Sequence, residues 1–192
     1  MAYQTYITEA IVCGVTNSNT ANRSYLLFTR DAGMVYAHAQ SVREERSKHR
    51  YGLQECSYVR VTLVRGKSGW RIVGVEPLQN FYTIAETRES RACVRNVLLL
   101  IKRCIQGETP HESIFHEVVH TCLQIGKYSP RTLELVLSLR MLHTLGYVSG
   151  TELDIQQMLT KSIDEVVQNE LSTEEEETYR ALSIYALKES HL

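Results

Sequence analysis

Residues 58–75, YVRVTLVRGKSGWRIVGV, contain two runs in which apolar and polar side chains alternate. Alternation with a period of two places successive side chains on opposite faces of a strand. The segment between the runs, Arg65 to Gly69, contains two glycines and has the length of a hairpin connection. This stretch therefore predicts a β-hairpin with one buried face.

Three further strands are predicted before this hairpin. Residues 3–17 are rich in Tyr, Thr, Ile and Val, and similar runs at 24–29 and 34–39 flank a turn at Asp31-Ala32-Gly33. A longer segment, residues 43–56, separates the third strand from the fourth. Five short strands with this spacing favour a small closed barrel such as the OB-fold, because closure hides the strand edges.

The hydrophobic period changes from two to 3.6 after Asn80, which predicts helices. Thr109-Pro110 and Ser129-Pro130 each predict an N-cap with proline at the first helical position, and Thr173 predicts another cap with Glu176 three residues on. We therefore expect an α+β protein. An OB-fold domain would occupy residues 1–80, and an all-α bundle of about five helices would occupy residues 81–192.

Charge is distributed unevenly between these two predicted domains. The chain has a net charge of -1, but residues 1–80 contain 10 Lys and Arg against 6 Asp and Glu, a net of +4. Residues 81–192 contain 11 against 16, a net of -5. A basic first half favours an anionic partner.

Five cysteines without a Cys-x-x-Cys pair are expected to be reduced thiols of a cytoplasmic protein. The first ten residues, MAYQTYITEA, lack the basic and apolar regions of a secretory signal, and no apolar run reaches the roughly 20 residues of a membrane span. We therefore expect a cytoplasmic, nucleoid-associated protein with no membrane partner.

Cations and aromatic side chains of the first half are the candidates for nucleic-acid binding, because cations contact phosphates and aromatic rings stack on unpaired bases. Many of them fall in the basic loop at 43–56, where Glu44 and Glu45 leave open the alternative of a merely solvated loop. Tyr58 and Trp70 lie nearby in the sequence. The predicted DNA-binding residues are Arg23, Arg30, Arg43, Arg46, Lys48, Arg50, Tyr51, Arg65 and Lys67.

The second half offers one catalytic motif, the HExxH pattern of residues 116–120. Two histidines four residues apart on a helix can bind zinc, with the glutamate as general base of a metallopeptidase. The apolar stripe of this helix centres on Ile114, Val118 and Cys122, which places His116 and His120 on its polar flank. We therefore expect no metal, no cofactor and no catalytic residue, and keep a zinc metallopeptidase as a remote alternative.

Other patterns of the second half favour structural roles. Phosphate-binding loops, dinucleotide-binding glycine motifs and nucleophile elbows are absent from the sequence. The apolar face of residues 130–145 is more typical of a core than of a docking groove. Arg131 and Arg140 are nevertheless predicted as residues that frame an acidic partner peptide beside it.

Several segments together resemble the RecO recombination mediators of bacterial DNA repair. They are Thr8 to Val12, Leu27 to Gly33, the loop from Arg43 to Gln54 that leads into the Leu-Val-Arg-Gly-Lys hairpin, and, more loosely, Leu139 to Tyr147. Where many members of the family carry a four-cysteine zinc module, this chain has TELDIQQMLTKSIDEVV, without cysteine. It resembles a short member of the family that lacks the zinc module.

The resemblance implies an OB-fold followed by a helical domain, binding to single-stranded and double-stranded DNA, and annealing of complementary strands. It also implies RecR and the C-terminal tail of the single-strand-binding protein as partners. Arg30, Arg43, Lys48 and Arg50 match the family's positively charged surface.

Two readings of the function follow. The first is a non-enzymatic DNA-binding and annealing protein of recombinational repair that helps load the recombinase with RecR. The alternative is a protein-interaction module of the repair machinery with little DNA binding.

Overall fold

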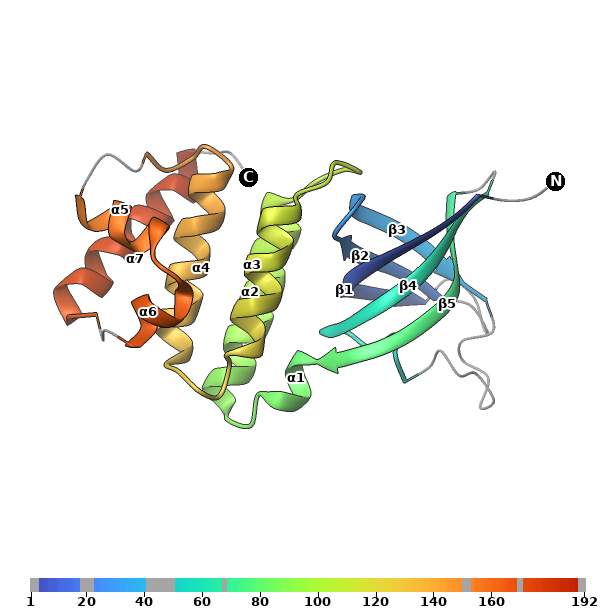
Figure 1. The fold of residues 1–192 in the computed structure, drawn as a ribbon, viewed down its shortest axis with the longest axis horizontal. Coiled ribbons are helices and arrows are strands. Elements are labelled where there is room, and N and C mark those ends of the chain that lie inside the picture. The colour runs from blue at the N-terminus through green and yellow to red at the C-terminus, as the bar shows by residue number, and fades with distance from the viewer. Residues whose placement is uncertain are drawn as a thin grey trace. The chain divides into compact units, whose positions relative to one another are not determined.

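Five strands, β1 to β5, close into a barrel, and seven helices follow among the residues that the structure describes (Figure 1). The computed structural model describes residues 4–17, 23–40, 51–66, 69–149, 153–168 and 171–189. The strands are β1 (Thr5–Asn17), β2 (Arg23–Thr29), β3 (Gly33–Ala39), β4 (Ser57–Gly66) and β5 (Gly69–Asn80). The helices are α1 (Phe81–Ile84), α2 (Arg88–Cys104), α3 (Glu112–Leu123), α4 (Pro130–Thr144), α5 (Leu153–Thr160), α6 (Ile163–Gln168) and α7 (Thr173–Glu189).

Strand order around the barrel is β1-β2-β3-β5-β4. The long strand β1 pairs with β4 through its first half and with β2 through its second half, and an irregularity in its pairing between Val12 and Gly14 bends it around the barrel. Parallel pairing of β3 with β5, at Ala37–Trp70 and His38–Arg71, completes the closure. This is the OB-fold topology, so the predicted α+β fold with an N-terminal five-stranded barrel is confirmed.

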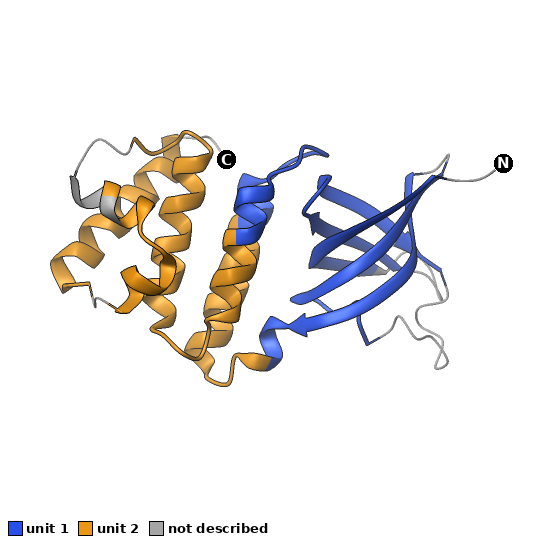
Figure 2. Ribbon diagram, in the orientation of Figure 1, with its two compact units in different colours: residues 1–83, 101–116 blue, residues 84–100, 117–192 orange. Residues whose placement is uncertain are grey.

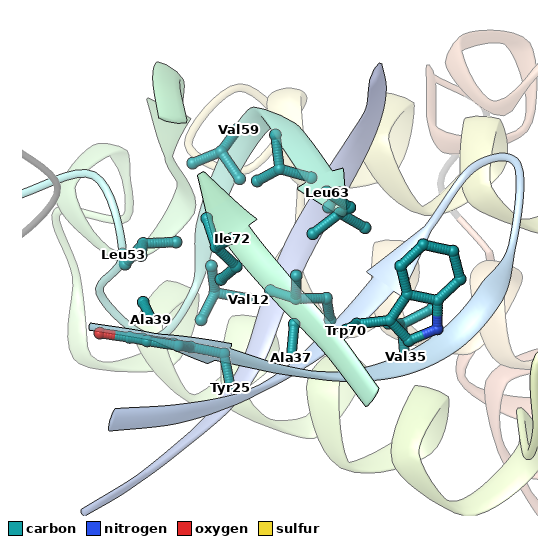
Figure 3. Close-up of a cluster of buried hydrophobic side chains, with 13 residues drawn as sticks. Val12, Tyr25, Val35, Ala37, Ala39, Leu53, Val59, Leu63, Trp70 and Ile72 are labelled. Carbon is teal, nitrogen blue, oxygen red and sulfur yellow. The ribbon is translucent and has the colours of Figure 1, made fainter. Parts of the chain in front are cut away.

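Alternating side chains of all five strands fill the barrel, as Figure 3 shows. On β3, Val35, Ala37 and Ala39 are buried inward, whereas Tyr36 and His38 between them are exposed. The inward set includes the single tryptophan, Trp70, which is 7% exposed. The alternation of apolar and polar residues in the sequence thus corresponds to the alternation of inward and outward side chains in the barrel wall.

Contacts divide the chain into two compact units (Figure 2). The barrel unit comprises residues 1–83 and 101–116, and the helical unit comprises residues 84–100 and 117–192. The end of α2, the start of α3 and the connector between them therefore belong with the barrel. A domain boundary at residue 80 stays a prediction.

Helix α4 is the centre of the helical unit and packs against α5, α6 and α7. Its buried side chains lie on nearly all sides of the helix: Thr132, Leu133, Leu135, Val136, Leu137, Leu139, Met141 and Leu142. A helix that is apolar all round is a core helix. The apolar residues of α4 are therefore core, as the sequence favoured over a docking groove.

Two predicted helix starts differ in outcome. Ser129 caps α4 as expected, because its side chain accepts a hydrogen bond from the Thr132 N–H and Pro130 is the first helical residue. Helix α3 begins at Glu112 rather than after Thr109, so that prediction is wrong. Residues 107–111 instead form a non-helical connector that is held to the start of β3, where the Met34 N–H donates to the Gly107 carbonyl.

The cap of α7 is one residue earlier than predicted. The Ser172 hydroxyl accepts from the Glu175 N–H, and the Glu175 carboxylate accepts from the Ser172 N–H. This reciprocal capping box replaces the predicted pair of Thr173 and Glu176. Ser162 and Glu165 form a second box of the same kind at the start of α6.

All five cysteines are buried and unpaired, as expected for reduced thiols. Burial raises the pKa of the Cys13 and Cys93 thiols to about 12, so both remain protonated and pack as small apolar side chains. Within the described ranges, no helix is long and apolar enough to span a membrane.

Gly33 offers a test of how the connector packs on the barrel. Its φ is +66°, and a Cβ there would lie 2.2 Å from the Thr109 carbonyl oxygen. Gly107 has a similar φ of +75° but nothing within 4 Å of such a Cβ. We expect Gly107→Ala to lower the free energy of unfolding by about 1 kcal/mol through backbone strain, and Gly33→Ala to lower it by about 2 kcal/mol more through overlap.

Urea unfolding followed by the fluorescence of Trp70 measures both variants in the barrel unit. Equal losses for the two alanines would contradict the close packing of residue 109 on the turn.

Candidate nucleic-acid interface

The outer face of β2 and β3 carries a cross-strand row of polar side chains. Register places Thr16 of β1 beside Ser24 of β2, Ser24 beside His38 of β3, and His38 beside Arg71 of β5. Ser24 Oγ and His38 Nδ1 are hydrogen bonded at 2.9 Å. Thr16, His38 and Arg71 are exposed, so this row presents donors and one permanent cation to solvent.

Arg71 differs from Arg60 and Arg65, the two arginines of β4, because it has no ion-pair partner among the described residues. Arg60, by contrast, is paired with Glu76 at 2.7 Å and lies 3.6 Å from Glu9. An unpaired guanidinium on a strand face is available to a phosphate group.

Tyr36 lies one step along the same face and is 69% exposed. It pairs across the strands with Leu26, which pairs in turn with Gly14, so its cross-strand neighbours are a half-buried leucine and, beyond it, a glycine. An exposed aromatic ring next to hydrogen-bond donors and a cation is the arrangement that single-strand-binding barrels use. We call Thr16, Ser24, Tyr36, His38 and Arg71 the β2–β3 face.

Arg30, one of the predicted DNA-binding residues, lies in the turn between β2 and β3 and is paired with Asp31 at 3.0 Å. The Arg30 guanidinium holds the pKa of the Asp31 carboxyl below its usual range, with a further contribution from the Thr8 hydroxyl, which donates to Asp31 at 2.6 Å. The positive charge of Arg30 is thus partly neutralised by the Asp31 carboxylate.

Arg65 is also paired within the molecule. Its guanidinium contacts the Glu108 carboxylate at 3.0 Å and lies 5.0 Å from the centre of the Trp70 ring. Trp70 donates its indole N–H to the same carboxylate at 3.0 Å. Arg65 therefore helps fix the connector to the hairpin between β4 and β5.

Arg23 lies at the start of β2, beside Tyr25 on the inward face. Arg23 Nε and Tyr25 Oη are both buried, and neither atom has a hydrogen-bond partner among the described residues. Burial raises the pKa of Tyr25, and the nearby Arg23 opposes this effect although the two groups are not in hydrogen-bond geometry. Arg23 is therefore partly buried at the barrel end.

The remaining predicted DNA-binding residues have mixed positions. Tyr51, in the described part of the basic loop, is 74% exposed. Lys67 and the loop cations Arg43, Arg46, Lys48 and Arg50 lie outside the described residues. Their part in binding stays a prediction.

The other aromatic residues named from the sequence are structural. Tyr58 stacks on Phe81 and donates its hydroxyl to Glu9, and burial together with this bond raises the pKa of Tyr58 to about 12. Trp70 is in the core, with Tyr6 edge-on at 5.2 Å. Neither ring is available for stacking on a base.

Arg140 is internal to the helical unit rather than a surface cation. Its side chain is 11% exposed, is paired with Glu117, and donates to the carbonyl oxygens of Met158 and Lys161. The Glu117 carboxylate and the two carbonyl oxygens accept the hydrogen bonds that the Arg140 guanidinium can donate. The predicted framing of a peptide by Arg140 therefore has no support in this geometry. Arg131, exposed in the first turn of α4, stays a predicted partner contact.

The two histidines of the HExxH pattern are on the surface. His116 and His120 have side chains that are 59% and 45% exposed, and each lies 3.5 Å from one carboxylate, Glu112 and Asp164 respectively. The glutamate of the pattern, Glu117, is paired with Arg140. No group of three metal-binding side chains occurs in the part of the chain that the structure describes.

Sequence reasoning did not single out Tyr36, His38 and Arg71. A signal for the first two was present, because Val35, Ala37 and Ala39 form the inward set of β3 and leave Tyr36 and His38 outward. Arg71 joins them only through the parallel pairing of β3 with β5, and that register cannot be read from alternation alone.

Comparison with known proteins adds an independent observation. No family model matches the chain. A curated protein of Desulfitobacterium hafniense (strain DSM 10664 / DCB-2), named DNA repair protein RecO, is 26% identical over 143 residues, which is 74% of this chain and 52% of that protein. Proteins with the same name from Acetivibrio thermocellus and Dehalococcoides mccartyi (strain ATCC BAA-2266 / KCTC 15142 / 195) are 23% identical over 142 residues and 30% identical over 114 residues.

The chain is a distant relative of the RecO proteins. It covers 57% of the Acetivibrio RecO and 45% of the Dehalococcoides RecO, with 73% and 59% of its own residues matched. It thus spans about half the length of the curated RecO proteins it matches.

The segments that resemble RecO in sequence lie mainly in the barrel. Thr8 to Val12 form the middle of β1, where pairing passes from β4 to β2. Leu27 to Gly33 form the end of β2 and the turn on which Thr109 packs. Leu139 to Tyr147 end α4, and Gly146 there has a φ of +82°.

Arg140 and Arg131 allow a matched test within α4. Removing Arg140 leaves Glu117 and two carbonyl groups without their partner, so we expect Arg140→Ala to lower the free energy of unfolding of the helical unit by about 3 kcal/mol. Arg131→Ala should change it by less than about 0.5 kcal/mol, because that side chain is exposed. Urea unfolding followed by circular dichroism measures both, and equal effects would refute the internal role of Arg140.

Proposed function

We propose that this protein is a non-enzymatic DNA-binding protein of recombinational repair, and that it binds single-stranded DNA on the β2–β3 face. The observation that carries the proposal is Tyr36, an exposed ring beside a row that ends in the unpaired Arg71, on an OB-fold barrel related to RecO. Oligonucleotides commonly bind OB-fold barrels on this face.

Annealing follows from the way in which such a face holds a strand. Cations and donors contact the phosphate groups, and most bases stay exposed to pair with a complementary strand. Double-stranded DNA then binds through its phosphates alone, without the contribution of base stacking. We further propose RecR and the C-terminal tail of the single-strand-binding protein as partners, on the basis of the resemblance to RecO.

The alternative, a protein-interaction module with little DNA binding, is favoured by one set of contacts. Arg30 and Arg65 are paired with Asp31 and Glu108, which reduces the positive charge that a strand would meet. This alternative expects binding to RecR together with negligible binding to a bare oligonucleotide.

Arg71 and Arg60 distinguish phosphate contact from general charge. Each phosphate contact with single-stranded DNA contributes about 0.7 to the slope of log affinity against log salt concentration. We expect Arg71→Ala to flatten this slope by about 0.7, and Arg60→Ala, which removes a paired strand arginine, to leave it unchanged. Fluorescence anisotropy titrations of labelled single-stranded DNA over a range of salt concentrations measure the slopes.

The basic loop has a separate test. Replacing Arg43, Arg46, Lys48 and Arg50 together by alanine should flatten the salt slope by about 3 if each contacts a phosphate. An unchanged slope would place the phosphate contacts elsewhere on the barrel, and an absence of binding by the unmodified protein would favour the protein-interaction alternative.

A further inference from the structure

A cleft of about 490 Å³ opens beside Tyr36, within the barrel unit. Leu26, Met34 and Tyr36 line it from β2 and β3. Lys102, Ile105 and Gln106 line it from the end of α2 and the connector to α3. The cleft thus combines the exposed ring of the β2–β3 face with residues far away in the sequence.

The connector is held firmly enough to form a fixed wall. The Met34 N–H donates to the Gly107 carbonyl at 2.9 Å, and Glu108 accepts from Trp70 and Arg65. Gly33 lies so close to Thr109 that any larger residue would overlap with it. The cleft is therefore part of the folded barrel unit and needs no closure to form.

The cleft suits a flat aromatic ligand with polar edges. Met34 and Ile105 are buried and apolar, and the Tyr36 ring is open on the solvent side. A planar ring stacked on Tyr36 would cover this apolar wall, and the polar edges of the ring would stay accessible to hydrogen-bonding groups.

Two polar side chains of the cleft have no partner among the residues that the structure describes. Lys102 and Gln106 make no hydrogen bond or ion pair within the described residues. An ammonium group and an amide at the rim match a phosphate and the donor and acceptor edge of a base. Glu108, which also lines the cleft, accepts hydrogen bonds from Arg65 and Trp70, so its negative charge is balanced by the Arg65 guanidinium.

We infer that this cleft holds one unpaired base of a DNA strand, stacked on Tyr36, with Lys102 on its phosphate and the Gln106 amide at its edge. The inference rests on the proposed function, and it adds which part of the strand enters the protein. It also gives residues of α2 and its connector a part in binding. A base in a duplex is stacked between its neighbours and cannot enter, so the cleft favours unpaired DNA.

A double-mutant cycle between the protein and the strand tests this contact directly. Affinity is measured for two oligonucleotides of equal length, one of ordinary thymidines and one of abasic residues that keep the phosphates. We expect Tyr36→Ala to weaken binding to the thymidine strand by between about 5-fold and 150-fold, the range for one lost base–aromatic stack. On the abasic strand the same variant should bind as the unmodified protein does.

Further variants separate the ring from the other groups. Tyr36→Phe should keep the affinity, because the ring stacks and the hydroxyl does not. Gln106→Leu should weaken binding to the thymidine strand alone, and Lys102→Met should weaken binding to both strands. Tyr185→Ala removes a tyrosine of similar exposure, 63%, from the helical unit and should change neither affinity.

Each other outcome has a definite meaning. Equal effects of Tyr36→Ala on both strands, with Trp70 fluorescence showing an intact barrel, would overturn the base contact and leave the proposed DNA binding standing. An absence of binding of the unmodified protein to either strand would overturn the proposed function itself.

Discussion

The arrangement of the barrel unit depends on the hydrogen bonds that the Glu108 carboxylate accepts. This carboxylate accepts hydrogen bonds from the indole of Trp70 and the guanidinium of Arg65, and so ties the connector after α2 to the hairpin between β4 and β5. Hydrogen bonds to a charged group contribute about 1.5 to 3 kcal/mol each, and the indole N–H is part of a nearly buried side chain. Together with the hydrogen bond from the Met34 N–H to the Gly107 carbonyl, this anchor fixes the wall of the cleft.

Internal pairing decides which cations of the barrel can meet a polyanion. The first 80 residues carry a net charge of +4, yet Arg30, Arg60 and Arg65 are each paired with a carboxylate. Arg71 and Lys102 have no such partner among the described residues. The net charge of a segment therefore does not show which of its cations are paired within the protein.

Local patterns predicted most of the fold. Alternation located the five strands, the helical period located the apolar face of α3, and Ser129 marked the start of α4. The start of α3 was wrong, because a contact with the distant turn at Gly33 outweighs the capping preference of Thr109. Tertiary contacts of this kind leave no trace in local sequence.

The candidate site was harder to predict for the same reason. Arg30 and Arg65 look like surface cations in the sequence, and only their spatial neighbours Asp31 and Glu108 show that they are paired. The β2–β3 face depends on the register of β3 with β5, and its cleft depends on residues that follow Lys102 in the chain. Composition indicated the anionic partner, whereas geometry selected Tyr36 and Arg71.

The discontinuity of the barrel unit has a consequence for synthesis on the ribosome. Phe28 is fully buried and packs edge-on against Phe115, so a nascent chain that has released only its five strands still exposes this ring. At about 5 to 20 residues per second, the interval before residue 116 follows residue 83 lasts roughly two to seven seconds. During that interval the Phe28 ring of the nascent barrel lacks its Phe115 partner, and the barrel depends on the later arrival of residues 101–116 to complete its packing.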